Sequence, residues 1–144
     1  MKSLRRAKGD QGEEIACGYL VDNGYKILGQ NFWRPFGEID IITKFRGRTL
    51  VFIEVKTIHR SGQMALSKPS HNPATIGQER GQAKDSIKPE DNLTAKKMAK
   101  LRRICEWYVG QEPQLVNLKY GWQIDLLSLT MSEESCLIRH YKNI

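Results

Sequence analysis

The sequence predicts a mixed α/β (α+β) fold in which a sheet is flanked by helices. Two stretches carry apolar residues at the spacing of an α-helix, and the runs between and after them are rich in Ile, Val and Phe, as strands are. The 144 residues suit a single domain spanning 1–144, since a chain of this length buries roughly 68–70% of its unfolded surface. With 40% hydrophobic and 27% charged residues, the composition excludes an intrinsically disordered chain.

The N-terminal part predicts a basic arm that leads into a helix within residues 1–24, followed by a strand over Tyr25–Phe32. Gly24 is typical of the residue that ends a helix, because glycine adopts the left-handed backbone conformation without steric penalty. One side of the helix is expected to carry Ile15, Ala16, Tyr19, Leu20 and Asn23. The basic residues of the arm could contact phosphates or form only a disordered tail. They are Lys2, Arg5, Arg6 and Lys8.

Two further strands, Gly37–Thr43 and Thr49–Lys56, are expected to form an antiparallel hairpin whose turn is Arg46–Arg48. A turn centred on Gly47 determines which residues face each other. One face would then carry an uninterrupted apolar layer, and a slip of one residue would force charged side chains into the core. This layer comprises Ile39, Ile41, Val51, Ile53 and Val55.

The other face of the hairpin would gather four charged side chains at one end of the sheet. In this register Asp40 faces Glu54 and Glu38 faces Lys56, with facing Cβ atoms about 4.5–5.5 Å apart. Two carboxylates at this distance repel each other unless a cation joins them, and Mg²⁺ prefers such oxygen ligands. A nearby lysine can orient an attacking water or stabilise negative charge developing on a phosphate. The alternative is a set of cross-strand ion pairs, each worth about 0.2–1 kcal/mol.

The second half predicts a helix over Leu93–Val109, with Asn92 or Thr94 as its N-cap, and then two strands joined by a polar turn. The strands are Gly121–Thr130 and Cys136–Tyr141. The inner stripe of the helix is expected to be Thr94, Met98, Leu101, Cys105 and Tyr108. Residues 60–90 hold three of the five prolines and few large apolar residues, so they are expected to form a flexible insertion or flap.

Charge and cysteine usage narrow the class of protein. The net charge of +7 favours an anionic partner such as a nucleic acid. The three cysteines, Cys17, Cys105 and Cys136, are widely spaced and lack the pairing of a disulfide or zinc framework. No apolar run reaches the ~20 residues of a membrane span, and a cytoplasmic location is expected.

The sequence resembles the PD-(D/E)XK nuclease superfamily and, more narrowly, the YraN family of Holliday-junction-resolvase-like proteins. The resemblance covers nearly the whole chain except residues 60–90, and its most specific part is the pairing of two motifs. These motifs are Gly37-Glu38-Ile39-Asp40 and Phe52-Ile53-Glu54-Val55-Lys56, preceded by Gly12-Glu13 in the first helix. Weaker matches are Lys97, Leu101, Tyr108, Ile124-Asp125 and Ile138-Arg139-His140-Tyr141-Lys142-Asn143.

The resemblance implies a restriction-endonuclease-like αβββαβ core with a mixed sheet, and a metal-dependent endonuclease that hydrolyses phosphodiester bonds. Asp40 and Glu54 would hold Mg²⁺ or Mn²⁺ with the Val55 carbonyl, Lys56 would serve the water and phosphate, and Glu13 would add a further acid. The implied partner is branched, damaged or otherwise non-B-form DNA in recombination or repair, cut by a homodimer. The alternative is a catalytically silent nucleic-acid-binding module with the same fold.

Two positions depart from the family pattern. The family usually has Arg where this chain has Ile58, and an Arg-Phe-Asp motif where this chain has Gln123-Ile124-Asp125. Both changes remove a positive charge that could contact a phosphate or a carboxylate. They leave the expected metal ligands unchanged.

Further nucleic-acid contacts are expected on the second helix, where Trp107 could stack on a base. The basic residues of this surface are Lys96, Lys97, Lys100 and Arg103. The alternative is a charged helix face that is only solvated. The aromatic residues Trp33 and Trp122 are expected in the core or at its rim. The histidines His59, His71 and His140 are expected to be ordinary polar residues, because they lack metal-binding spacing.

Overall fold

The computed structural model describes residues 4–60 and 93–144, with side chains from residue 11 onward. Within these ranges it confirms the expected fold class, a five-stranded mixed sheet flanked by helices, consistent with a restriction-endonuclease-like core. The elements are α1 (Leu4–Asp22), β1 (Tyr25–Arg34), β2 (Gly37–Phe45), β3 (Thr49–His59), α3 (Ala95–Gln111), the short 3₁₀ helix η1 (Pro113–Leu115), β4 (Trp122–Met131) and β5 (Cys136–Tyr141).

The sheet follows the order β1-β2-β3-β4-β5 and changes direction once. β3 and β4 run parallel, whereas every other pair of neighbours is antiparallel. Parallel neighbours need a crossover connection, and α3 lies in the chain between these two strands. The predicted order of one helix, three strands, one helix and two strands is therefore correct.

Several strands run longer than the sequence predicts. β1 and β2 extend two residues beyond the expected ends, to Arg34 and Phe45, and β3 extends to His59. The extra residues are partly polar, so alternation of apolar residues does not mark them. The extension of β1 to Arg34 matters for the site, because Trp33 and Arg34 pair with Glu38 and Gly37 in the part of β2 that no longer pairs with β3.

The N-terminal region differs from the expected arm. α1 already begins at Leu4, so Arg5, Arg6 and Lys8 lie in the helix. Basic residues are good helix formers, and a charge run does not separate an arm from a helix. No helix in the described ranges is long and apolar enough to cross a membrane. Lys2 and nearly all of the expected insertion at 60–90 lie outside the described residues.

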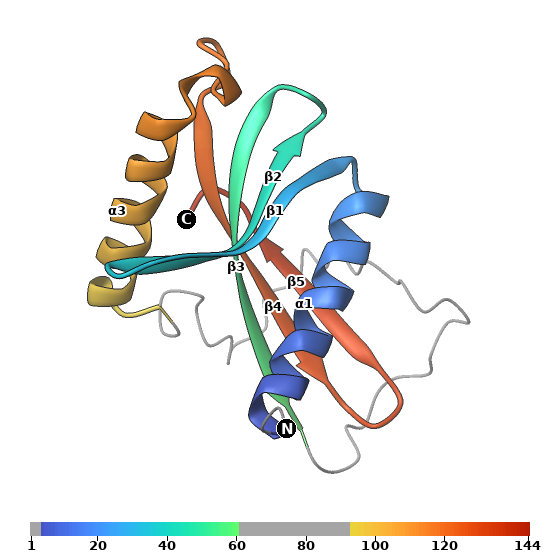
Figure 1. The fold of residues 1–144 in the computed structure, drawn as a ribbon. Helices are drawn as coiled ribbons and strands as arrows, with labels where there is room; N and C mark the ends of the chain where they lie inside the picture. Colours follow the sequence, from blue (N-terminus) through green and yellow to red (C-terminus); the bar gives the residue numbers. More distant parts are fainter. Residues whose placement is uncertain (1–3, 61–92) are drawn as a thin grey trace.

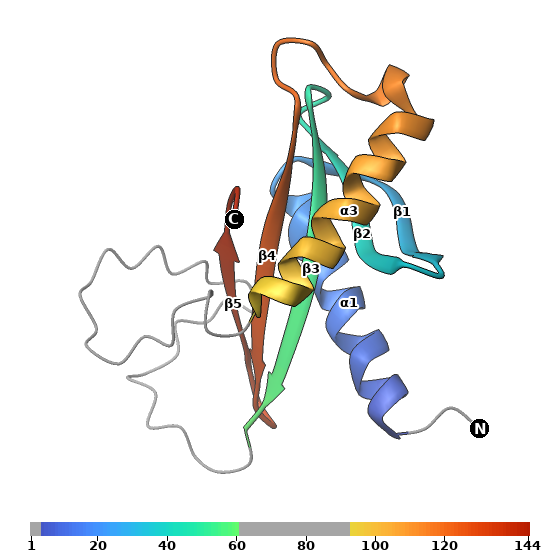
Figure 2. The ribbon, with the colours of Figure 1, turned by 90° about the vertical axis from the view of Figure 1, so that its left-hand side faces the viewer.

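A helix covers each face of the sheet, with a hydrophobic cluster beneath it (Figure 1, Figure 2). The cluster beneath α1 comprises Ala16, Leu20, Tyr25, Ile41, Val51, Ile53, Leu127 and Leu129. The cluster beneath α3 comprises Ile39, Ile42, Leu50, Phe52, Leu101, Ile104, Cys105 and Ile124. The expected apolar layer is therefore wrong for Ile39, which packs beneath α3 while Ile41 packs beneath α1. Two-stranded ribbons twist strongly, and β1 and β2 form such a ribbon beyond Ile41.

α3 begins at Ala95 and is capped as expected by Thr94, whose side chain accepts a hydrogen bond from the Lys97 backbone N–H at 3.2 Å. Thr94 is exposed in this role, so its assignment to the inner stripe is wrong. The fully buried Ile104 was missing from that stripe. Gly37 of β2 lies against Ile104, where an added Cβ would be 3.2 Å from the Ile104 Cβ.

α1 approaches β3 closely at one glycine. A Cβ added to Gly12 would lie 2.2 Å from the Thr57 hydroxyl oxygen, well inside van der Waals contact. Only a residue without a side chain allows the helix to lie this close to the strand. This contact positions the neighbouring Glu13 relative to the strand that carries Glu54.

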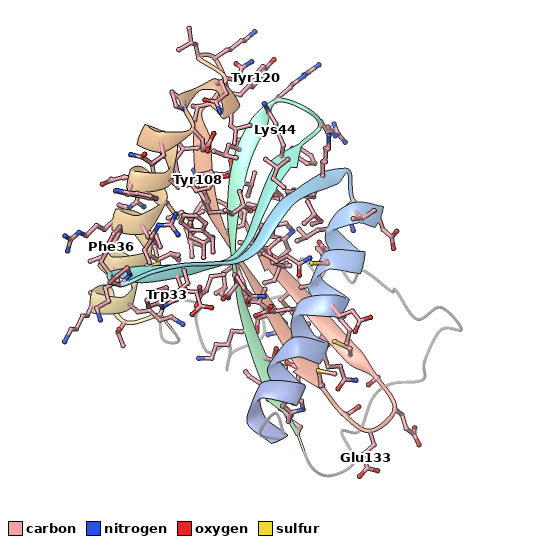
Figure 3. The ribbon with its side chains drawn as sticks, viewed as in Figure 1. Trp33, Phe36, Lys44, Tyr108, Tyr120 and Glu133 are labelled. Atoms are coloured by element: carbon pink, nitrogen blue, oxygen red, sulfur yellow. The ribbon has the colours of Figure 1, made fainter. Side chains whose placement is uncertain are left out.

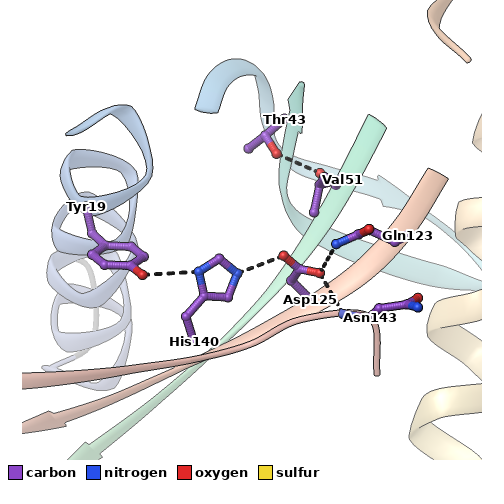
Figure 4. A network of polar contacts seen from close by, with 7 residues as sticks. All are labelled: Tyr19, Thr43, Val51, Gln123, Asp125, His140 and Asn143. Carbon is purple, nitrogen blue, oxygen red and sulfur yellow. Dashed lines mark hydrogen bonds and ion pairs between the residues drawn. The ribbon is translucent and has the colours of Figure 1, made fainter. Parts of the chain in front are cut away.

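A buried polar network joins α1, β4 and β5 (Figure 4). The carboxylate of Asp125, fully buried on β4, lies 2.7 Å from Nε2 of His140 and accepts hydrogen bonds from the Gln123 side chain and the Asn143 backbone N–H. The Tyr19 hydroxyl lies 3.2 Å from Nδ1 of His140. Burial, and then the charge of Asp125, raise the pKa of Tyr19, so its hydroxyl keeps its proton. His140 is thus a buried structural residue, not the ordinary polar histidine expected.

The contact at Gly12 yields a stability prediction. Gly12→Ala should lower the free energy of unfolding by about 1–3 kcal/mol, because the added methyl collides with Thr57. Gly18→Ala is the matched control on the same helix, since nothing lies within 4 Å of its added Cβ. It should raise stability by about 0.5–1 kcal/mol. Urea denaturation measures both changes.

A double variant separates this collision from other effects. Adding Thr57→Ala to Gly12→Ala removes the hydroxyl and should restore most of the lost stability. Additive losses in the double variant would show that Gly12 matters for a reason other than its distance from Thr57.

Candidate active site

The site lies where β2 separates from β3. The predicted hairpin register is correct from Phe45↔Thr49 to Ile41↔Ile53, but there the pairing of the two strands ends. At the next position the Val55 backbone N–H donates to the Asp40 carboxylate at 2.8 Å. The expected ladder pairs Asp40–Glu54 and Glu38–Lys56 are therefore wrong. The Val55 N–H thus donates to a side-chain carboxylate instead of a backbone carbonyl of β2, and β2 no longer pairs with β3 beyond this point.

Glu54 is buried and points beneath α3. Its exposed fraction is 7%, and its carboxylate forms an ion pair with Lys97. The pKa of the neighbouring Cys105 thiol is raised to about 12, mainly by burial, and the charge of Glu54 contributes to this rise. The expected pairing of Glu54 with a neighbouring strand is thus replaced by an ion pair with the covering helix.

Asp40 is the most perturbed acid of the site. Burial and the charges of Glu54, Glu13 and Glu38 together raise its pKa to about 7, and the hydrogen bond from the Val55 backbone opposes this rise. Glu13 thus acts on the site from α1, as the resemblance implied for it. Burial and like charges together disfavour a charged Asp40 at neutral pH.

Lys56 follows Glu54 by two positions and is half-buried. Alternation along β3 places it on the face of Glu54, beneath the N-terminal half of α3. Asp40, Glu54 and Lys56, with Glu13 and Glu38, therefore occupy one region. The hairpin register is the predicted one as far as it extends, and beyond its end the Asp40 carboxylate contacts the Val55 backbone instead of a strand partner.

The donor set suits a hard divalent cation. It offers carboxylate oxygens, and Mg²⁺ commonly takes only one or two protein carboxylates and fills its other positions with water and substrate. A cation between Asp40 and Glu54 would also relieve the repulsion that raises the Asp40 pKa. Among the described residues, no group of three or more Asp, Glu, His or Cys side chains is arranged to hold a metal ion. Asp40 and Glu54 supply two carboxylates, which is the number of protein ligands that Mg²⁺ commonly takes.

The outer surface of α3 is basic, as the sequence predicts. Lys96, Lys97, Lys100 and Arg103 are all exposed, and the Lys97 ammonium also forms the ion pair with Glu54. Trp107 is half-buried, with ring centroids 6.1 Å from Phe32 and 5.8 Å from Phe36. Its packing against the β1–β2 hairpin leaves it less open for a base than expected.

Three features went unrecognised in the sequence. Lys97 precedes Leu101 of the buried stripe by four positions, and this spacing already placed it on the inner side of α3. Trp33 is 63% exposed, so its assignment to the core or rim is wrong. Gln123, which replaces the family's arginine, donates from its side chain to Asp125 at 2.8 Å. A neutral donor thus contacts this carboxylate.

The raised pKa of Asp40 makes stability depend on pH. The folded protein holds this proton up to a pH of about 7, whereas the unfolded chain releases it near the ordinary value of 3.8. The folded state therefore binds more protons in this window, and the free energy of unfolding falls as pH rises through it.

Asp40→Asn removes this titration, and its amide oxygen can still accept the Val55 N–H. The stability of the variant relative to wild type should increase from pH 4 to pH 7, by on the order of 1–3 kcal/mol, and then level off. Urea denaturation across this range measures it, with the exposed Glu14→Gln as the matched carboxyl control. A difference that is flat or falls with pH would contradict the assignment.

Comparison with known proteins places the chain in a family. A family model described as "Uncharacterised protein family UPF0102" matches residues 12–129. A UPF0102 protein of Moorella thermoacetica is 36% identical over 110 residues, which cover 76% of this chain and 72% of that protein. One of Caldicellulosiruptor saccharolyticus is 31% identical over 139 residues, covering 96% of this chain and 97% of that protein. The chain belongs to the UPF0102 family, the YraN family that its motifs resemble.

Proposed function

We propose that the protein is a Mg²⁺- or Mn²⁺-dependent DNA endonuclease that hydrolyses phosphodiester bonds. The observation that carries this proposal is the meeting of Asp40 and Glu54 where β2 leaves β3, with Lys56 on the same strand and face as Glu54. The alternative, a set of surface ion pairs, does not explain why two acids lie close enough for the charge of Glu54 to raise the pKa of Asp40. An acid whose pKa burial and like charges raise to about 7 is typical of a functional site.

The roles follow from the chemistry of each side chain. Asp40 and Glu54 would hold the divalent cation, with the Val55 carbonyl as a further oxygen. When bound, the cation polarises a phosphoryl oxygen and lowers the pKa of water. The Lys56 ammonium orients the attacking water or stabilises negative charge on the phosphate as the bond breaks. Glu13 adds negative charge from α1 and so favours retention of the cation.

Lys97 and the exposed cations of α3 supply positive charge around these acids. The Lys97 ammonium neutralises Glu54 when no cation is bound, and a cation at Glu54 would compete with it. Lys96, Lys100 and Arg103 extend the positive surface outward along α3, where they can contact DNA phosphates. The acids thus bind the cation, and the helix binds the polyanion.

A cleavage assay tests the proposal directly. Labelled linear, flapped and four-way-junction DNA is incubated with Mg²⁺, Mn²⁺ or EDTA. Wild type should cut in the presence of either metal and not in EDTA. Asp40→Asn and Lys56→Ala should each reduce the rate by at least about a hundredfold, because each removes a metal ligand or a charge that stabilises the transition state. Retarded but uncut DNA in every lane would instead favour a silent nucleic-acid-binding module.

Metal binding can be tested without turnover. Mn²⁺ or Mg²⁺ at about 100 times its Kd should stabilise the folded wild type by about 2.7 kcal/mol, because a ligand of the native state shifts the unfolding equilibrium. Asp40→Asn should lose most of the corresponding rise in Tm, whereas Glu14→Gln, an exposed acid next to Glu13, should keep it. An equal rise in all three proteins would place the cation elsewhere.

A further inference from the structure

The end of the β1–β2 hairpin is attached to α3 by aromatic rings. Phe32 contacts Tyr108 edge-to-face, with ring centroids 5.1 Å apart, and Phe36 contacts Trp107 at 5.8 Å. Aromatic pairs of this geometry stabilise packing beyond the area they bury. The hairpin end is therefore held in place and is not a free loop (Figure 3).

Trp33 lies between these anchored residues but does not share their burial. It is 63% exposed, the highest value for an aromatic side chain in the described ranges. It pairs across the ribbon with Glu38, whereas Phe32 pairs with Ile39 of the cluster beneath α3. Side chains alternate between faces, so Trp33 faces away from α3 on a backbone that α3 holds rigid.

Two guanidinium groups lie at the same end of the hairpin, on the side that packs against α3. Arg34 stacks 4.4 Å from the centroid of Phe32 and 5.0 Å from that of Trp107, and it donates to the Trp33 carbonyl at 2.8 Å. Arg103 of α3 lies 5.5 Å from the centroid of Phe36. Arginine keeps its charge at any physiological pH, so the hairpin end carries an exposed indole on one side and positive charge on the other. Single-stranded nucleic acid binds to surfaces that combine an aromatic platform for a base with positive charge for the neighbouring backbone.

The platform lies close to the candidate active site. Its cross-strand partner Glu38 precedes Asp40 by two positions, which places the Trp33 Cα roughly 7–8 Å from that of Asp40. The Glu38 carboxylate repels a phosphate at this point but tolerates the uncharged face of a base. A base within a duplex is stacked on both sides, so only an unpaired base can take this position.

We propose that Trp33 stacks on an unpaired base next to the scissile phosphate, while Arg34 and Arg103 contact the flanking backbone. This inference rests on the proposed nuclease function and specifies its substrate class: DNA with a single-stranded segment beside the cut, such as a flap or the open centre of a branched molecule. The occupant of the hairpin end is a DNA strand, and a protein partner there is the alternative that the test excludes.

The test measures binding alone. Asp40→Asn protein in EDTA is titrated with fluorescent duplex DNA that either carries a single-stranded flap or is blunt. Adding Trp33→Ala should weaken binding to flapped DNA roughly tenfold or more and change blunt-duplex binding less than about twofold. Trp33→Phe, which keeps an aromatic face, should retain most of the affinity. Tyr120→Ala is the matched control, since Tyr120 is an exposed aromatic beside Arg48 and Lys119 but lies far from the hairpin end (Figure 3).

The outcomes separate this inference from the proposed function. Unchanged affinity of Trp33→Ala for flapped DNA, an equal loss on blunt duplex, or an equal loss in Tyr120→Ala would each overturn it, whether or not the wild type cuts. A Trp33-dependent preference for flapped DNA supports it, even when cleavage assays show no turnover. In that case the nuclease proposal fails and the single-strand contact remains.

Discussion

The hydrogen bond from the Val55 backbone N–H to the Asp40 carboxylate sets the geometry on which the rest of the site depends. A backbone N–H buried in a sheet needs an acceptor, and here a side chain supplies it in place of the neighbouring strand. β2 is thereby released from β3, and together with β1 it continues as a ribbon to α3. The same separation opens the space in which acids from β2, β3 and α1 approach each other.

The charges around this opening are balanced by the helix above it. A buried carboxylate is costly without a partner, and the Lys97 ammonium on α3 neutralises Glu54. Burial and the charges of three neighbouring acids raise the pKa of Asp40 to about 7. The site therefore carries an excess of negative charge on one strand pair, while the surrounding helix is basic. This polarity suits the proposed cation at the acids and the proposed nucleic acid on the surface of α3.

The order of the elements could be predicted because each helix, strand and turn has a local pattern in the sequence. Contacts between residues far apart in the sequence leave no such pattern. The Gly47 turn and the apolar runs of β2 and β3 gave the correct register up to Ile41↔Ile53. The end of that ladder depends on where the Asp40 side chain points, and no periodicity records this. Ile39 changes face because a two-stranded ribbon twists more than a broad sheet. The partners of Lys97 and His140 lie on elements distant in the sequence, so pairwise spacing could not reveal them.

The parallel pairing of β3 with β4 also bears on how the chain folds. Leu50 pairs with Trp122, so the two central strands meet only after a long stretch of chain, including α3, has been brought into place. The local contacts of β1, β2 and β3 can form early. Pairing of β3 with β4 is slower, because the connecting chain loses conformational entropy before the stabilising contacts between the two strands form. That loss grows only logarithmically with length. The crossover can therefore lengthen greatly during evolution at little thermodynamic cost, while the acids of β2 and β3 stay together.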